Sequence, residues 1–321
     1  MEIFLLTVKQ MLLMFILIMV GFILRKKSIL PENSGTVMAK METWIFCPAL
    51  LLATQMKKCT VETFSNNAPL ILYGLAFIVC AIALAYLLSM VFVRNAKTAE
   101  DLYQRNIYKY ALTFGNYGFV GNMIILGVWG EDMFFQYSLF TFFVAMFCSS
   151  WGLYILIPKD QGASLLANLK KGLLAPPIVG LAIGVVLGLT GAAKYVPEFV
   201  VGALDDAGKC QGPVAMILAG FVIGGYNFKE LFTNVKVYIV AFVRLIGIPA
   251  VMMLVLKALG ANDIIMTLAL VTFATPLGMN TIVYPAAYGG DTKTGASMTM
   301  ISQVLSVITI PLMYLVFIVM M

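Results

Sequence analysis

Long apolar stretches alternate with short polar connectors along the whole chain, and this pattern predicts an all-α polytopic membrane protein. A helix needs about 20 apolar residues to cross the hydrocarbon core of a bilayer. By that measure the sequence predicts ten transmembrane spans, at residues 3–24, 36–56, 68–93, 106–128, 133–157, 173–191, 203–225, 235–257, 263–287 and 295–320.

Two of the predicted spans carry helix-breaking residues near their middle. The fourth contains "TFGNYGFVGN" (113–122) and the ninth contains "ATPLGMNT" (274–281). Glycine and proline weaken a helix, and side-chain amides need hydrogen-bond partners where no water is present. Freed backbone groups are tolerated at that depth only where they line a cavity or are buried in protein. Both segments are therefore predicted to be interrupted helices around a binding site.

The interruptions recur at a fixed interval. Spans two and seven each contain a proline followed by small and aliphatic residues, at Pro48 and Pro213. Spans four and nine are both broken, and spans five and ten are unbroken apolar helices. Matching spans are always five apart, and an odd repeat length places the two halves in opposite orientations. Such an inverted repeat is typical of secondary transporters.

The interrupted helices predict an anion site near the midplane. The N-terminus of a half-helix carries partial positive charge, so it attracts an anion without a full cation in the membrane. We expect these N-termini around residues 118–122 and 278–281. The nearby hydrogen-bonding side chains are those of Asn116, Asn122, Asn280 and Thr281.

Composition agrees with a membrane protein and fixes a predicted orientation. Hydrophobic residues make up 61% of the chain, charged residues 11%, and the mean hydropathy is +0.96. The first apolar segment is too long for a signal-peptide core and is read as a retained span. Connectors after odd-numbered spans hold most of the basic residues, which the positive-inside rule assigns to the cytoplasm: Arg25, Lys26, Lys27, Arg94, Lys97, Arg105, Lys159, Lys170, Lys171, Lys229 and Lys293. The connectors after even-numbered spans hold Lys57, Lys58, Lys194 and Lys257. Both termini are therefore expected outside the cytoplasm, in a multi-pass protein of the cell membrane.

Several function classes lack the residues that they need. The 5 cysteines show no metal-ligand spacing, histidine is absent, and no P-loop motif occurs. No basic stripe suited to nucleic acid is present. We expect no metal, no cofactor and no nucleic-acid partner, and no enzyme activity. Spans three, four, five, nine and ten contain no Asp or Glu inside their termini, which argues against a cation/proton antiporter.

With these motifs in view, the chain resembles the auxin efflux carrier family, in its bacterial, malate permease-like branch. The matching stretches are "FGNYGFVGN" in span four, "GPVAMILAG" in span seven, "AFVRLIGIPAVM" in span eight, "FATPLGMNTIVYPAAYGGD" in span nine and "VLSVITIPL" in span ten. The resemblance covers essentially the whole chain in order. One position departs from the family pattern, since Met123 stands where the fourth span usually has a proline.

The resemblance implies a ten-helix carrier with a fold related to the bile acid:sodium symporters. Residues 1–67 and 158–227 would form a scaffold, and residues 68–157 and 228–321 a mobile transport domain. It also implies a homodimer through the scaffold, an elevator-type movement and a small organic anion as substrate. The residues expected to contact substrate are Asn116, Gly118, Gly121, Asn122, Thr275, Pro276, Gly278, Asn280, Thr281 and Gln303.

Other interpretations of the polar positions stay open. Intramembrane asparagines also join helices, and Gln303 can pair with a neighbouring helix. Arg244 either balances an anionic substrate or caps backbone carbonyls. Asp205, Asp206 and Lys209 form either a coupling-ion site or, as we expect, a solvated ion pair. Lys40 and Glu42 are interpreted in the same way. The glycines of span six are expected to pack against another helix: Gly180, Gly184 and Gly188.

A sodium-coupled symporter of the bile acid:sodium symporter type is the alternative function. Its sodium ligands would come from polar side chains at the interrupted helices, for which Asn116, Thr275 and Gln303 are available. A channel or an intramembrane enzyme is less well supported, because no repeat other than the inverted halves occurs and no carboxylate lies near an intramembrane Ser or Thr.

Overall fold

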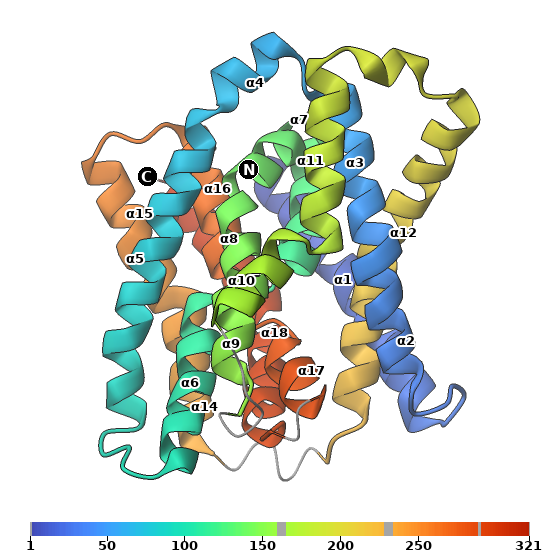
Figure 1. Cartoon of the computed structure of the whole chain (residues 1–321). Helices are drawn as coiled ribbons and strands as arrows, with labels where there is room; N and C mark the ends of the chain where they lie inside the picture. The colour runs from blue at the N-terminus through green and yellow to red at the C-terminus, as the bar shows by residue number, and fades with distance from the viewer. Residues whose placement is uncertain (1, 159–164, 228–233, 288–289, 321) are drawn as a thin grey trace.

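The computed structural model describes residues 2–158, 165–227, 234–287 and 290–320, and the described chain is helical throughout (Figure 1). Its α-helices are α1 (Glu2–Lys26), α2 (Ser34–Met41), α3 (Cys47–Lys58), α4 (Val61–Asn67), α5 (Pro69–Phe92), α6 (Ala99–Thr113), α7 (Asn122–Phe140), α8 (Phe142–Phe147), α9 (Leu153–Leu156), α10 (Leu165–Leu173), α11 (Pro176–Leu189), α12 (Glu198–Gly224), α14 (Val235–Phe242), α15 (Ile248–Ala258), α16 (Asp263–Ala274), α17 (Asn280–Ala287) and α18 (Lys293–Tyr314). Wider π-helical turns extend several of them: η1 (Glu42–Phe46), η2 (Tyr117–Gly121), η3 (Cys148–Gly152), η6 (Val243–Gly247) and η7 (Leu315–Val319).

Helices occupy every range in which the sequence predicts a span. Among the described residues, 6 helical segments are long and apolar enough to cross a membrane, or up to 8 if each bent pair is one span. The protein is therefore a polytopic membrane protein. The predicted fourth and ninth spans are interrupted, and α16 on its own is a short apolar helix. The prediction that the fifth span is unbroken is wrong, because the helical segments Tyr117–Phe140 and Phe142–Leu156 meet at an angle of 53°.

Short polar motifs set where several helices begin. The side chain of Thr98 accepts a hydrogen bond from the backbone N–H of Asp101, and the Asp101 carboxylate accepts one from the N–H of Thr98. This reciprocal capping box starts α6. Hydrogen bonding of its carboxyl to the side chain and the backbone N–H of Thr98 lowers the pKa of Asp101. Asn262 caps α16 by accepting from the N–H of Ile265 at 2.9 Å.

Glycine contacts hold the long outer helices together. α3 lies along α11, and α1 lies along α12. A Cβ added to Gly184 of α11 would come within 2.8 Å of the Leu52 carbonyl oxygen, and one added to Gly180 within 2.7 Å of the Pro48 oxygen. Helix backbones can approach this closely only where side chains are small. The predicted packing role of the α11 glycines is therefore confirmed.

Several other helices pack together as a second group. α5 packs on α6, α14 packs on α18, and α15 packs on α16. In Figure 1 the chain ends marked N and C both lie in the upper half of the view. Of the basic residues used to predict orientation, Lys159 and Lys229 lie outside the described residues.

One segment predicted as a connector is helical. Residues Leu165–Leu173 form α10, which packs against η3 and bends by 48° into α11. The sequence placed these residues in the connector before the sixth span, and it did not predict that this connector contains a helix. Its leucines recur at helical spacing in "LLANLKKGL", an amphipathic pattern that the two lysines mask when charge alone is considered.

Candidate functional site

Two interrupted helices cross at the centre of the second group. α6 ends at Thr113, and helical structure resumes with η2 at Tyr117. α16 ends at Ala274, and α17 begins at Asn280. The two extended segments pair through an antiparallel bridge between Gly115 and Leu277. Both predicted interruptions are therefore confirmed, and they meet.

Hydrogen bonds replace those that the helices lose at this crossover. The N–H of Asn116 donates to the carbonyl of Pro276 at 2.7 Å, and the N–H of Leu277 donates to the Ser302 hydroxyl at 3.0 Å. The carbonyl of Asn116 accepts from the N–H groups of Val120 and Gly121. These are the first hydrogen bonds of η2, so helical structure resumes at Tyr117, one residue before the predicted range of 118–122.

Glycine is required at the bridge itself. A Cβ added to Gly115 would collide with the Arg244 guanidinium and the Thr275 hydroxyl, and would lie 3.0 Å from the Thr275 carbonyl. Gly118, two residues into the next helical turn, has no atom within 4 Å of an added Cβ. The two glycines therefore serve different purposes, since the first allows the crossing and the second leaves open space.

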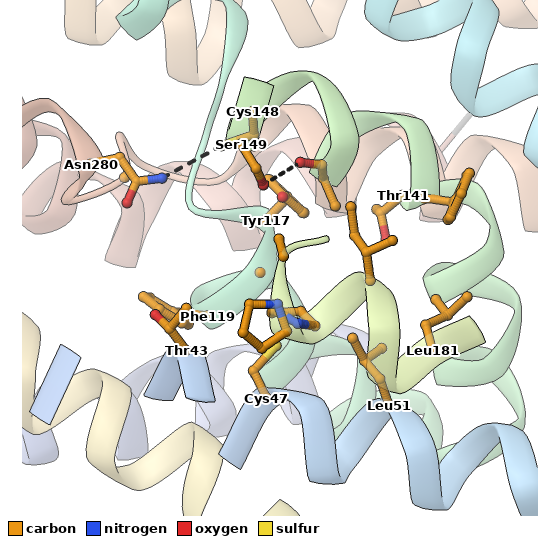
Figure 2. Close-up of a pocket in the computed structure, with 18 of the residues that line it drawn as sticks. Thr43, Cys47, Leu51, Tyr117, Phe119, Thr141, Cys148, Ser149, Leu181 and Asn280 are labelled. Atoms are coloured by element: carbon orange, nitrogen blue, oxygen red, sulfur yellow. Dashed lines mark hydrogen bonds between the residues drawn. The ribbon is translucent and has the colours of Figure 1, made fainter. Parts of the chain in front are cut away.

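A cavity of about 750 Å³ lies against the crossover. Figure 2 shows Cys47 and Leu51 of α3, Tyr117 and Phe119 of η2, Thr141 before α8 and Asn280 of α17 around the same space. α11 contributes Leu181 to the lining. The walls thus come from both helix groups.

Half of the predicted substrate contacts line this cavity. Those that do are Asn116, Gly118, Asn122, Gly278 and Asn280. Those that do not are Gly121, Thr275, Pro276, Thr281 and Gln303.

Three of the residues outside the lining are engaged in packing or in local hydrogen bonds. An added Cβ at Gly121 would collide with the Tyr137 hydroxyl. Thr275 donates to the carbonyl of Thr272 at 3.2 Å, and Thr281 donates to that of Gly278 at 3.1 Å. These three residues lie in or beside the crossover segments and do not line the cavity.

Asn116 and Asn280 differ in the state of their amides. Asn116 is 5% exposed, and its Nδ2 has no hydrogen-bond partner. Asn280 donates its Nδ2 to the Tyr110 hydroxyl at 2.9 Å and lies 3.5 Å from the Cys148 sulfur, as Figure 2 shows for the latter. Only the first of these two donors is free for a guest in the cavity.

Arg244 lies directly behind the crossover. Its side chain is fully buried, so it does not reach the aqueous surface. The guanidinium lies 5.8 Å from the centre of the Phe273 ring and makes a long contact, 3.5 Å, with the carbonyl of Leu112 near the end of α6. A cation there offsets the negative end of the helix. Arg244 does not line the cavity.

Two lysines that sequence reasoning assigned to a connector line the cavity instead. Lys170 and Lys171 lie on α10, and no Asp or Glu is among the described residues of the lining. The amphipathic pattern of α10 was the signal that could have found them. Gln211 was also missed. Its Nε2 donates to the carbonyl of Gly118 at 3.1 Å, joining α12 to the crossover.

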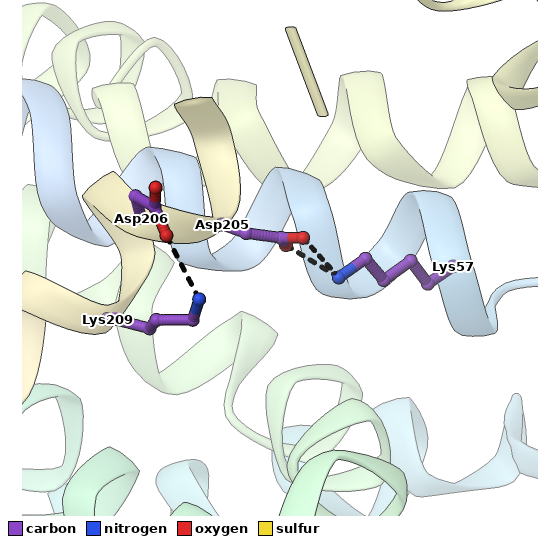
Figure 3. Close-up of polar contacts among 4 residues, drawn as sticks. All are labelled: Lys57, Asp205, Asp206 and Lys209. Carbon is purple, nitrogen blue, oxygen red and sulfur yellow. Dashed lines mark hydrogen bonds and ion pairs between the residues drawn. The ribbon is translucent and has the colours of Figure 1, made fainter. Parts of the chain in front are cut away.

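Acidic residues form ion pairs at one end of the outer helices. Asp205 pairs with Lys57 of α3 at 2.6 Å, and Asp206 pairs with Lys209 at 3.0 Å (Figure 3). The side chains of the second pair are 75–80% exposed. These contacts agree with the solvated ion pairs that the sequence predicts.

The same interpretation fails for Glu42. Its side chain is 0% exposed, and neither carboxyl oxygen has a hydrogen-bond partner of good geometry. Lys40, the expected partner, is exposed on the preceding turn. Glu42 lies on the buried side of η1, which packs against α12.

Comparisons with known proteins point in one direction. A family model described as "Membrane transport protein" matches residues 6–314. An uncharacterized transporter of Methanocaldococcus jannaschii is 23% identical over 317 residues, covering 94% of this chain and 96% of that protein. Because the family model spans nearly the whole chain, this protein belongs to the membrane transport protein family, the auxin efflux carrier family that its motifs resemble, and it is a transporter and not an enzyme.

Proposed function

We propose that this protein is a secondary transporter that moves a small organic anion, such as a mono- or dicarboxylate, across the cell membrane. The observation that carries the proposal is the composition of the crossover cavity. Lys170 and Lys171 are its charged lining residues among those described, and the unpaired Nδ2 of Asn116 lies at its wall. Cations and an unused N–H donor favour a carboxylate guest.

The backbone adds to this preference. Gly118 and Asn122 line the cavity in the first turns of the helix that starts at Tyr117. The N–H groups at such a helix start carry partial positive charge, so they can bind an anion without the burial of a charged side chain. The substrate-binding residues that we propose are those of the crossover, with Asn116 as the central donor.

The movement that we propose is an elevator-type alternation. In this account residues 1–67 and 158–227 form the scaffold, and residues 68–157 and 228–321 form the transport domain. We also propose that the protein has ten spans in two inverted repeats, with a bile acid:sodium symporter-like fold. It would form a homodimer through the scaffold, with both termini outside the cytoplasm. Support comes from the paired interruptions and from a cavity that has walls from both groups.

Flux into proteoliposomes tests the function. Purified protein should take up labelled malate, succinate or indole-3-acetate with saturation, and unlabelled anion inside the vesicles should accelerate uptake by counterflow. Flux that rises linearly with concentration and shows no counterflow would indicate a channel. No flux of any carboxylate would reject the proposal.

A sodium gradient distinguishes the alternative. The same uptake is measured with sodium outside, with sodium on both sides and with sodium replaced by potassium. Strict dependence on an inward sodium gradient would identify sodium-coupled symport of the bile acid:sodium symporter type.

A further inference from the structure

Glu42 is a buried carboxyl that does not line the crossover cavity. It lies in η1, within the helical segment Ser34–Lys58 that qualifies as a membrane span. Its side chain is 0% exposed, and both carboxyl oxygens lack a hydrogen-bond partner of good geometry. An isolated ionised carboxylate in an apolar interior is very costly, and such a group normally becomes neutral instead. The burial of Glu42 therefore favours the neutral, protonated form of its carboxyl.

The polar neighbour of Glu42 is also incompletely paired. The side chain of Gln211 on α12 lies beside the carboxyl. Gln211 is 1% exposed, and its Oε1 has no hydrogen-bond partner. A protonated carboxyl has one O–H to donate, and an amide oxygen is its natural acceptor. One hydrogen bond from Glu42 to Gln211 would satisfy two of the buried groups that lack partners.

The other end of the Gln211 amide reaches the crossover. Its Nε2 donates to the carbonyl of Gly118 at 3.1 Å, and Gly118 lines the cavity. A path of polar groups thus runs from the Glu42 carboxyl through one amide to the helix start at the site.

We propose that Glu42 is a proton-binding site and that Gln211 transmits its protonation state to the crossover. When the proton is bound, Glu42 donates to Oε1 of Gln211, which leaves Nε2 on the carbonyl of Gly118. When the proton leaves, the carboxylate can only accept and it repels Oε1, so the amide of Gln211 turns its N–H groups toward Glu42. The hydrogen bond from Nε2 to the carbonyl of Gly118 is then weakened.

The surroundings of Glu42 offer no compensating cation among the described residues. The elements packed against η1 are α2, α3, α11 and α12, and α11 has no ionisable residue. Cys47 of α3 is the titratable group close enough to interact with Glu42. The other ionisable residues of these helices do not contact the carboxyl: Lys40, Lys57, Lys58, Glu198, Asp205, Asp206, Lys209 and Cys210.

The consequence for transport rests on the proposed function. Glu42 belongs to the proposed scaffold, so its proton does not travel with the substrate. Instead, the protonation state of Glu42 determines whether Gln211 holds the crossover segment at Gly118 against α12, and this makes transport sensitive to pH.

Infrared spectroscopy of the purified protein in lipid tests the site with the proton itself as the probe. Wild-type protein should show the band of a protonated carboxyl at neutral pH, and alkaline pH should remove it. Glu42→Gln should lack the band, whereas Glu62→Gln, at an exposed carboxyl on α4, should keep it. Absence of the band from the wild type, or its persistence in Glu42→Gln, would overturn the proposal.

A second variant guards against misfolding and tests the hydrogen bond. Gln211→Leu keeps the carboxyl but removes its acceptor, so the band should remain and move to the position of a carboxyl without a hydrogen bond. An unchanged band position would show that Gln211 does not pair with Glu42.

Hydrogen–deuterium exchange tests the link to the crossover. After correction for intrinsic exchange, residues 114–122 should exchange faster at alkaline than at neutral pH in the wild type, and this response should be lost in Glu42→Gln. The same response in both proteins would reject the link. Neither measurement needs a transported anion, so failure of carboxylate uptake and failure of this inference are separate results.

Discussion

At the scale of single residues, the two halves of the crossover are not equivalent. Asn116 has an unused donor at the cavity wall, whereas the donor of Asn280 is held by Tyr110. Of the two matching asparagines, one therefore has an amide available to a substrate, and the other holds neighbouring helices together. Gly115 and Gly118 show the same division, since only the first is confined by its neighbours.

The glycine pair gives a prediction with its own control. Gly115→Ala forces a Cβ against the Arg244 guanidinium and the Thr275 backbone, and overpacking of this kind typically costs about 1–3 kcal/mol. We expect a lower thermal midpoint and strongly reduced uptake. Gly118→Ala meets no atom within 4 Å, so its midpoint should match that of the wild type. Equal midpoints in all three proteins would show that the crossing tolerates a side chain at Gly115.

At the scale of elements, α10 brings positive charge to a cavity that is otherwise uncharged among the described residues. Lysine attracts an anion over a distance, and dissolved salt screens that attraction. Removing the charge should therefore affect substrate capture more than the fold.

We predict that Lys170→Gln combined with Lys171→Gln slows the initial rate of malate uptake several-fold at low ionic strength. The difference from the wild type should shrink as salt is added. A matched control is Lys27→Gln, at an exposed lysine between α1 and α2 that lies outside the cavity lining. Uptake by the double variant that equals the wild type at every salt concentration would contradict the role of α10.

The contact between α11 and α3 gives a second prediction at this scale. In Gly184→Val the new Cβ would lie 2.6 Å from the Cβ of Gln55 and 2.8 Å from the Leu52 oxygen, so the two helices must separate. We expect loss of the monodisperse peak in detergent or a clearly lower thermal midpoint. Gly202→Val on α12 has no atom within 4 Å and should behave as the wild type. Stable Gly184→Val protein would show that this contact is not close.

At the scale of the whole molecule, one ion pair joins the proposed scaffold to the proposed transport domain, and another lies within the scaffold. Lys58 of α3 pairs with Asp132 of α7 at 2.8 Å, which joins the proposed scaffold to the proposed transport domain. Lys57 pairs with Asp205 within the scaffold (Figure 3).

These two pairs predict the outcome of cross-linking. Exposed Cys80 and Cys210 are first replaced by serine. A bifunctional thiol reagent that joins Lys58→Cys to Asp132→Cys should stop uptake, and reductant should restore it, because the domains can no longer slide. The same reagent across Lys57→Cys and Asp205→Cys should leave uptake intact. Continued uptake with the first pair joined would exclude an elevator movement across this boundary.

The sequence predicted the interrupted helices well, because Gly, Asn and Pro in an apolar span have few structural explanations. It did not predict α10, because its two lysines placed the segment in a connector and its leucine spacing was not considered. The burial of Glu42 was also missed, because η1 packs against α12, which is distant in sequence. Gln211 reaches the crossover over 93 positions of sequence, which no local pattern reveals.

The central claim is that the crossover cavity binds an organic anion through Asn116. Scintillation proximity measures binding of labelled malate, succinate or indole-3-acetate to purified protein, with and without sodium. A hydrogen bond to a charged group contributes about 1.5–3 kcal/mol, so Asn116→Leu should weaken binding by roughly 10- to 100-fold. Asn67→Leu, outside the cavity lining, should bind as the wild type does. Equal affinity in Asn116→Leu and wild-type protein would contradict the account.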